Sequence, residues 1–287
     1  MGLYAATRDL LQFDPGTGMV HAGGVARWFE RLLRAGERTS GLPPSANGAS
    51  SFHLRWEIDG RFASAEVTLE VLEPPQVDSL YFWALQADFT DRTGHHRGGA
   101  HLGLQWFARH PGSTAVNWGG YDDTGRELEG TLSTLPSSTQ NPNTRDFQWR
   151  PGVPYRLRIA LAGVTGDATA WTGSIVELGS DRRTPAGPGV EIRRLLVPGG
   201  SELAGCLVWS EVFARCDAPS VSVRWSDPLV VGVDGRTTAP NWVTPTFQRH
   251  EDGGCANTDS MTDAVGVIQR TGVRRSTLPG RRLAVPS

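Results

Sequence analysis

Apolar and polar residues alternate along most of the chain from residue 52 onward. A period of two is typical of β-strands that bury one face. Turn signals such as Asp59-Gly60 separate the alternating segments. The segments predicted as strands are 52–58, 63–72, 79–89, 100–107, 114–118, 155–161, 170–178, 190–196, 206–213, 221–225, 229–233, 242–247 and 265–271. So many short strands predict an all-β fold, an antiparallel β-sandwich of the jelly-roll type.

The period is different near the start of the chain. Residues 25–35 place their apolar side chains on one helical face, namely Trp28, Phe29, Leu32 and Leu33. Residues 39–51 are rich in Ser, Gly, Pro and Asn, which is typical of a loop. We therefore expect an N-terminal extension with one short helix over residues 1–50, packed on the body. A β-sandwich domain over 51–272 and a loose tail over 273–287 follow it.

Composition narrows the classes of partner. The chain has 287 residues, of which 38% are hydrophobic, and a net charge of -2. So weak a charge predicts neither nucleic-acid nor membrane-surface binding, and no apolar run approaches the ~20 residues of a membrane span. The first 14 residues lack the pattern of a secretory signal, which predicts a cytoplasmic location for the chain as given, or secretion if a leader has been removed.

The polar residues of the predicted strands fall on one side of each strand. If these strands share a sheet, one surface collects amides, a carboxylate, an imidazole and guanidinium groups. Such a surface suits the hydroxyls of a carbohydrate or another small polar ligand. The alternative is an ordinary solvated sheet face. The residues concerned are Gln86, Asp88, His101, Gln105, Asn117, Arg156 and Arg158.

A second candidate segment, residues 115–123, combines an amide, two aromatic rings and carboxylates with two glycines at a strand end. Loops at sheet edges often carry function, so Asn117, Trp118, Tyr121 and Asp122 are predicted to bind the ligand. Alternatively, this is a wide turn in which Trp118 and Tyr121 close the core.

Glu211 is a carboxylate within an otherwise apolar strand. With Asp88 and His101 it gives a candidate acid-base set for an enzyme, a hydrolase or lyase acting on a glycan or a small metabolite. The alternative is a cross-strand salt bridge between Glu211 and Arg224, which we expect in preference. Glycan recognition without catalysis is the first functional hypothesis. Catalysis is the second, and a structural or assembly role is the third.

No metal or cofactor site is predicted. Residues 94–101 hold three histidines, but neighbouring histidines on a hairpin point apart, so we expect a solvated loop. The three cysteines, Cys206, Cys216 and Cys255, lack zinc-ligand spacing. They leave two alternatives open, one disulfide with a free thiol or three reduced thiols.

The order of the segments 81–89, 98–106 and 115–121 resembles a family of uncharacterised bacterial proteins, the DUF3472-like proteins. In that family an aromatic strand precedes a "GLQ" strand and a tryptophan strand with glycines. The later segments WSEVFARC (209–216) and GGCANT (253–258) are similar to actinobacterial proteins. The resemblance covers residues 50 to 270. It implies a concanavalin-like sandwich associated with carbohydrates and assigns no catalytic residue.

Overall fold

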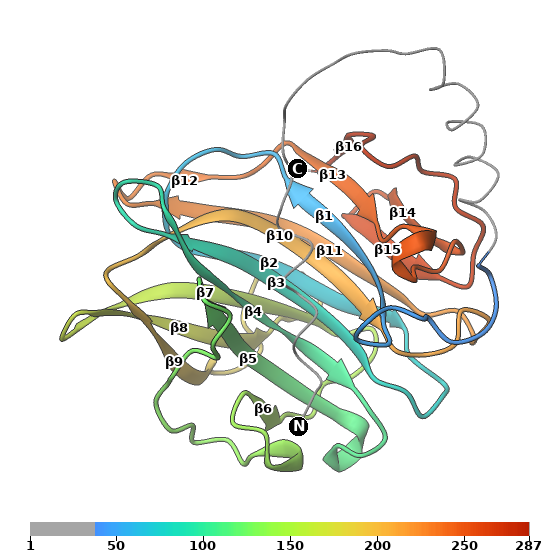
Figure 1. Ribbon diagram of the computed structural model, residues 1–287, viewed down its shortest axis with the longest axis horizontal. Helices are drawn as coiled ribbons and strands as arrows, with labels where there is room; N and C mark the ends of the chain where they lie inside the picture. The colour runs from blue at the N-terminus through green and yellow to red at the C-terminus, as the bar shows by residue number, and fades with distance from the viewer. Residues whose placement is uncertain (1–37, 287) are drawn as a thin grey trace.

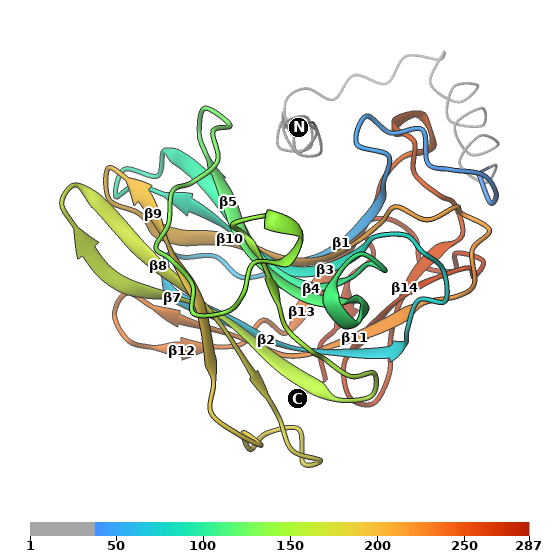
Figure 2. The ribbon, with the colours of Figure 1, turned by 90° about the horizontal axis from the view of Figure 1, so that it is seen from below.

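Two antiparallel sheets pack face to face in residues 38–286, the part of the chain that the computed structural model describes (Figures 1 and 2). The predicted all-β antiparallel sandwich is confirmed. The predicted helix over residues 25–35 lies outside the described residues. Within residues 38–286 the helical segments are short 3-10 turns, and no helix is long and apolar enough to cross a membrane.

The first sheet has the strand order β6-β5-β4-β3-β10-β1-β13-β16. Its central strands are the predicted alternating segments: the odd-numbered residues of β3 from Tyr81 to Phe89 all belong to the main core, whereas Phe82 and Ala84 form a separate buried cluster with Leu207 and Trp209. The strands are β1 (Ser50–Trp56), β3 (Tyr81–Thr90), β4 (His96–Trp106), β5 (Thr114–Asp122), β6 (Thr144–Asp146), β10 (Glu202–Val212), β13 (Trp242–Phe247) and β16 (Leu283–Ala284).

The second sheet has the order β9-β8-β7-β2-β11-β15-β14, with β12 paired to β11. A short pairing of Leu203 with Phe62 connects β10 of the first sheet to β2 of the second. The strands are β2 (Phe62–Glu73), β7 (Pro154–Thr165), β8 (Ala168–Glu177), β9 (Val190–Pro198), β11 (Ser222–Gly232), β12 (Thr237–Thr238), β14 (Thr258–Thr262) and β15 (Val267–Thr271).

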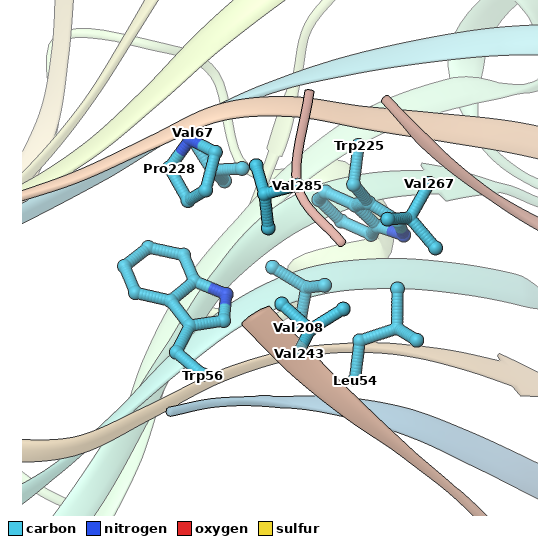
Figure 3. A pocket seen from close by; sticks show the side chains of 9 residues that line it. All are labelled: Leu54, Trp56, Val67, Val208, Trp225, Pro228, Val243, Val267 and Val285. Atoms are coloured by element: carbon cyan, nitrogen blue, oxygen red, sulfur yellow. The ribbon is translucent and has the colours of Figure 1, made fainter. Parts of the chain in front are cut away.

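The core lies between the two sheets and is rich in large aromatic side chains, among them Trp83, Trp118 and Trp171, each at most 1% exposed. Figure 3 shows a small pocket in this interior, to which both sheets contribute. Its lining is aliphatic apart from two indole rings, so it offers almost no polar group to orient a ligand. The lining residues are Leu54, Trp56, Val67, Val208, Trp225, Pro228, Val243, Val267 and Val285. We interpret it as a gap in core packing.

The C-terminal segment corrects the expectation of a loose tail. Leu283 is buried, and β16 pairs with β13 at the edge of the first sheet. Ser276 and Thr277 donate backbone hydrogen bonds of 3.0 Å to the Asp259 carboxylate. A basic segment with little periodicity is therefore fixed by one sheet edge and one carboxylate, neither of which alternation can reveal.

Candidate functional site

The polar residues of the first sheet gather on its outer face, the side turned away from the second sheet. Figure 2 shows this face flanked by the loop before β1 and by the loop between β5 and β6. Register places its residues in rows that cross neighbouring strands. One row consists of Ser51, Glu211, Phe82, Gln105, Ala115 and Asp146. The next consists of His53, Trp209, Ala84, Gly103, Asn117 and Thr144.

Glu211 is half-buried on β10, and its carboxylate accepts a hydrogen bond of 2.8 Å from Nδ2 of Asn47. The backbone N–H of Ala49 and the hydroxyl of Ser45 donate to the Asn47 Oδ1, which fixes the orientation of that amide. Burial raises the pKa of Glu211 to about 7, and it outweighs the lowering by hydrogen bonds from Asn47 and Ser51. The carboxyl therefore changes charge near neutral pH.

The expected salt bridge between Glu211 and Arg224 is not formed. Arg224 lies on β11 in the second sheet, where it pairs with Glu70 at 2.8 Å and Asp263 at 2.7 Å. The neighbours of β10 are instead β1 and β3, so the next strand predicted along the chain is not the next strand in space.

Gln105 is held by a buried hydrogen-bonded chain. The His110 Nε2 lies 3.2 Å from the Gln105 Oε1, and the His110 Nδ1 lies 2.7 Å from the Ser138 hydroxyl. Because an amide oxygen only accepts, His110 donates from Nε2 and accepts from Ser138. Burial lowers the pKa of His110, which favours the neutral ring that the hydrogen bonds to Gln105 and Ser138 require. The Gln105 NH₂ group is left to donate elsewhere.

Three rings pack edge to face on the same surface. The ring centroids of Phe82 and Trp209 are 4.8 Å apart, and His101 lies 5.5 Å from Phe82 and 5.9 Å from Trp209. Burial lowers the pKa of His101 to about 4, so it is neutral at pH 7. The Trp209 Nε1 is buried without a hydrogen-bond partner among residues 38–286. The cluster forms an apolar patch next to Glu211.

The predicted acid-base set shares this face but does not converge. Asp88 lies on β3 six positions from Phe82, the residue paired with Glu211, a separation of roughly 20 Å along the strand. His101 pairs with Gln86, four positions from Phe82. Burial raises the pKa of Asp88. Glu211, Asp88 and His101 therefore cannot act on one reacting atom.

Some of the predicted ligand-binding residues lie elsewhere. Arg156 and Arg158 belong to β7 of the second sheet, and Arg158 pairs with Glu66 at 3.7 Å, which corrects their assignment to the surface of Gln86. Trp118 is fully buried in the core. Asp122 accepts hydrogen bonds within the turn that follows β5.

The remaining predicted residues, Gln86, Gln105, Asn117 and Tyr121, fall by strand parity on the outer face. The Asn117 Nδ2 donates to the Thr144 hydroxyl at 2.9 Å, while its Oδ1 is buried and has no hydrogen-bond partner in the described part of the chain. Sequence reasoning missed Asn47, His110 and Ser138. All three lie outside the strands, and only the fold brings them to Glu211 and Gln105.

The described residues also include possible metal ligands and three cysteines. Among residues 38–286 no group of three or more His, Cys, Asp or Glu side chains is placed to hold a metal ion. Cys216 and Cys255 form a disulfide, and Cys206 is a buried free thiol. The first of the two alternatives for the cysteines is therefore the observed one.

No family model and no curated protein matches the chain, so the DUF3472-like resemblance stays a prediction. Similar solved structures include scytalido-glutamic peptidase with a peptide-based transition state analogue (TM-score 0.45, 13% identity, 77% of this chain and 98% of that chain). Another is SCP-B, a member of the eqolisin family of peptidases, in complex with Ala-Ile-His (TM-score 0.42, 12% identity, 77% of this chain and 98% of that chain). A third is the PL-14 alginate lyase from Aplysia kurodai (TM-score 0.25, 10% identity, 54% of this chain and 70% of that chain). Similarities this distant carry no argument about activity.

Proposed function

We propose that the chain is a hydrolase of acyl bonds, with Glu211 as the acid-base group and Gln105 as a hydrogen-bond donor. The observation that supports this is their common row: Glu211 on β10 and Gln105 on β4 flank Phe82 on β3. Two strand spacings separate their backbones by roughly 10 Å. In this proposal the bound carbonyl group lies over the Phe82 ring, between the two side chains.

The chemistry needs one proton acceptor and one donor. Ionised Glu211 takes a proton from a water molecule, whose oxygen adds to the carbonyl carbon. The Gln105 N–H donates to the carbonyl oxygen as it gains negative charge. The neutral Glu211 then returns its proton to the leaving nitrogen or oxygen, and the carbon–heteroatom bond breaks. A pKa of about 7 suits both transfers at neutral pH.

The same geometry is unfavourable for glycoside hydrolysis by two carboxyl groups. That reaction requires carboxyl groups about 5 to 9.5 Å apart. Asp88 lies roughly 20 Å from the row of Glu211, and Asp146 is four strand spacings away in that row, roughly 19 Å. A single carboxyl beside an amide suits acyl chemistry better. A peptide with an apolar side chain would place that side chain on Phe82 and Trp209.

Carbohydrate recognition is the second candidate, and a separate observation favours it. The Trp209 Nε1 and the Asn117 Oδ1, in one row of the outer face, are both buried without a hydrogen-bond partner. A sugar hydroxyl both donates and accepts, so it could satisfy either atom. This candidate requires binding and no catalysis.

The experiment that separates the two uses the full chain against fluorogenic peptide and ester libraries, with a polysaccharide panel followed by calorimetry. We expect peptide or ester cleavage, a loss of at least about 10³-fold in Glu211→Gln and of about 10²-fold in Gln105→Ala. Glu66→Gln, on the second sheet, is the matched control and should retain activity. Cleavage that survives in Glu211→Gln overturns the hydrolase proposal. Saccharide binding without any cleavage favours the second candidate.

A further inference from the structure

Two buried arginines lie away from the outer face, at the edge of the sandwich. Arg145 on β6 pairs with Val116, a core residue, so its side chain leaves the first sheet on the inner side. Arg193 is on β9, the edge strand of the second sheet. Backbone hydrogen bonds between residues 129–131 and β9 close this edge, and Nη1 of Arg193 donates to the Pro142 carbonyl at 3.3 Å.

Neither arginine has a counterion in contact in the part of the chain that the structure describes. Arg193 is 6% exposed and Arg145 is 9% exposed. Within residues 38–286 neither forms a salt bridge, and Nε of each is buried without a hydrogen-bond partner. The Oδ1 of Asn143, two residues before Arg145, is also without a hydrogen-bond partner among the described residues. Buried charges in folded proteins are normally paired, because removing an unpaired charge from water is strongly unfavourable.

The local charge is unbalanced. Burial, and then the charge of Arg145, lowers the pKa of Arg193, so the two guanidinium groups repel each other. Glu127 opposes this, but its carboxylate is exposed and accepts a hydrogen bond from the Asn143 amide. The loop lies tight against Arg193, since a Cβ at Gly130 would come within 2.9 Å of its Cζ. Residues 38–286 therefore enclose two cations with one partial counter-charge.

We propose that Arg145 and Arg193 bind a small oxyanion between them, of the phosphate, sulfate or carboxylate class. Guanidinium groups present planar pairs of N–H donors that match the oxygens of such anions. The unpartnered Nε atoms supply donors that the protein leaves unused. The site lies on the opposite side of β5 and β6 from Asn117 and Thr144, so it does not depend on the proposed hydrolase.

The test is calorimetry and thermal unfolding of the full chain in HEPES with phosphate, sulfate or acetate, against chloride of equal ionic strength. We expect saturable binding of at least one oxyanion and a matching rise in Tm that chloride does not give. Binding of phosphate and sulfate but not of acetate would indicate a tetrahedral ligand. Binding of acetate alone would indicate a carboxylate ligand.

Arg193→Met and Arg145→Met should each weaken that binding at least tenfold. Because each removes an uncompensated buried charge, neither should lower Tm in chloride. Arg194→Met is the matched control, since Arg194 is half exposed and already pairs with Glu191 at 3.1 Å, and it should retain binding. The proposal is overturned if no oxyanion binds the wild type, or if Arg193→Met binds it equally well. Should both variants fail to fold, the wild-type calorimetry decides alone.

Discussion

At the residue scale, Glu211 makes a prediction about stability that is independent of substrate. Its pKa is about 7 in the folded protein and 4.5 without burial, so folding favours the protonated form. The contribution is fully present below pH 4.5 and is lost as the pH rises through 7. We expect the stability of Glu211→Gln, which is always neutral, relative to wild type to be about 3 kcal/mol greater at pH 8 than at pH 4.

Urea unfolding at the two pH values measures this difference. His53 and His101, whose pKa values burial lowers to about 4, act with the opposite sign between pH 6.5 and 4. They are present in both proteins, so their effect cancels in the comparison. Glu251→Gln, on an exposed 3-10 turn, serves as the control and should show no such dependence on pH. Parallel pH curves for wild type and Glu211→Gln would contradict the prediction.

Sequence reasoning found Glu211 and Gln105 but not what holds them. The sequence pattern identifies Glu211 as a carboxylate in an apolar strand and Gln105 as an amide on the polar face of an alternating strand. The prediction that Arg224 pairs with Glu211 was wrong. Arg224 is close along the chain, but the spatial neighbours of β10 come from residues 50–56 and 81–90. Asn47, His110 and Ser138 lie in loops, where no period marks a direction.

At the element scale, the close approach of β3 and β4 depends on Gly103. A Cβ at this position would lie 1.9 Å from the Trp83 carbonyl oxygen, which belongs to the backbone of β3 and cannot rotate away. Gly103→Ala should push the two strands apart and lower the free energy of unfolding by about 2 to 4 kcal/mol. Urea unfolding measures the loss.

Gly187→Ala is the matched control for Gly103→Ala, since nothing lies within 4 Å of its added Cβ, and it should change stability by less than about 0.5 kcal/mol. If Gly103→Ala is as stable as this control, the pairing of β3 and β4 is looser than the register implies.

The alternation of apolar and polar residues predicts a strand only where the strand is long. β3 was predicted to within two residues of its ends, whereas β4 begins at His96, four residues before the predicted start; within both predicted segments the apolar face was assigned correctly. β6 has three residues, too few to show a period, yet it contributes Thr144 and Asp146 to the outer face. β11 was predicted as two strands because Asp227-Pro228 interrupts it. There the register shifts, and a bulge accommodates the proline.

At the scale of the whole molecule, the alternation of apolar and polar residues predicts a two-layer fold. It does not predict the sheet to which each strand belongs. Arg156 and Arg158 were assigned to the surface of Gln86 and Gln105 because all of these residues are polar positions of alternating strands. β7 pairs with β2 and β8, which places it in the other layer. Strand order depends on long-range pairing, which the period of one segment does not contain.

The disulfide between Cys216 and Cys255 connects the two layers and gives the last prediction. It joins the segment after β10 to the segment before β14, 39 residues apart. The Cys216 N–H donates to the Gly41 carbonyl, so the disulfide also secures the loop that carries Asn47. On the loop-entropy estimate, the double variant Cys216→Ala/Cys255→Ala should lose about 4 kcal/mol of unfolding free energy.

Unfolding with and without reductant checks the double variant. Wild type should lose stability on reduction, whereas the double variant should not change further. Cys206→Ala, which removes the buried free thiol, should lose stability on reduction as wild type does, because it keeps the disulfide. Since Asn47 is held through the same loop, reduction should also weaken the difference between Glu211→Gln and wild type at pH 8. A reduced protein with unchanged stability and an unchanged pH difference would show that the loop is held by its hydrogen bonds alone.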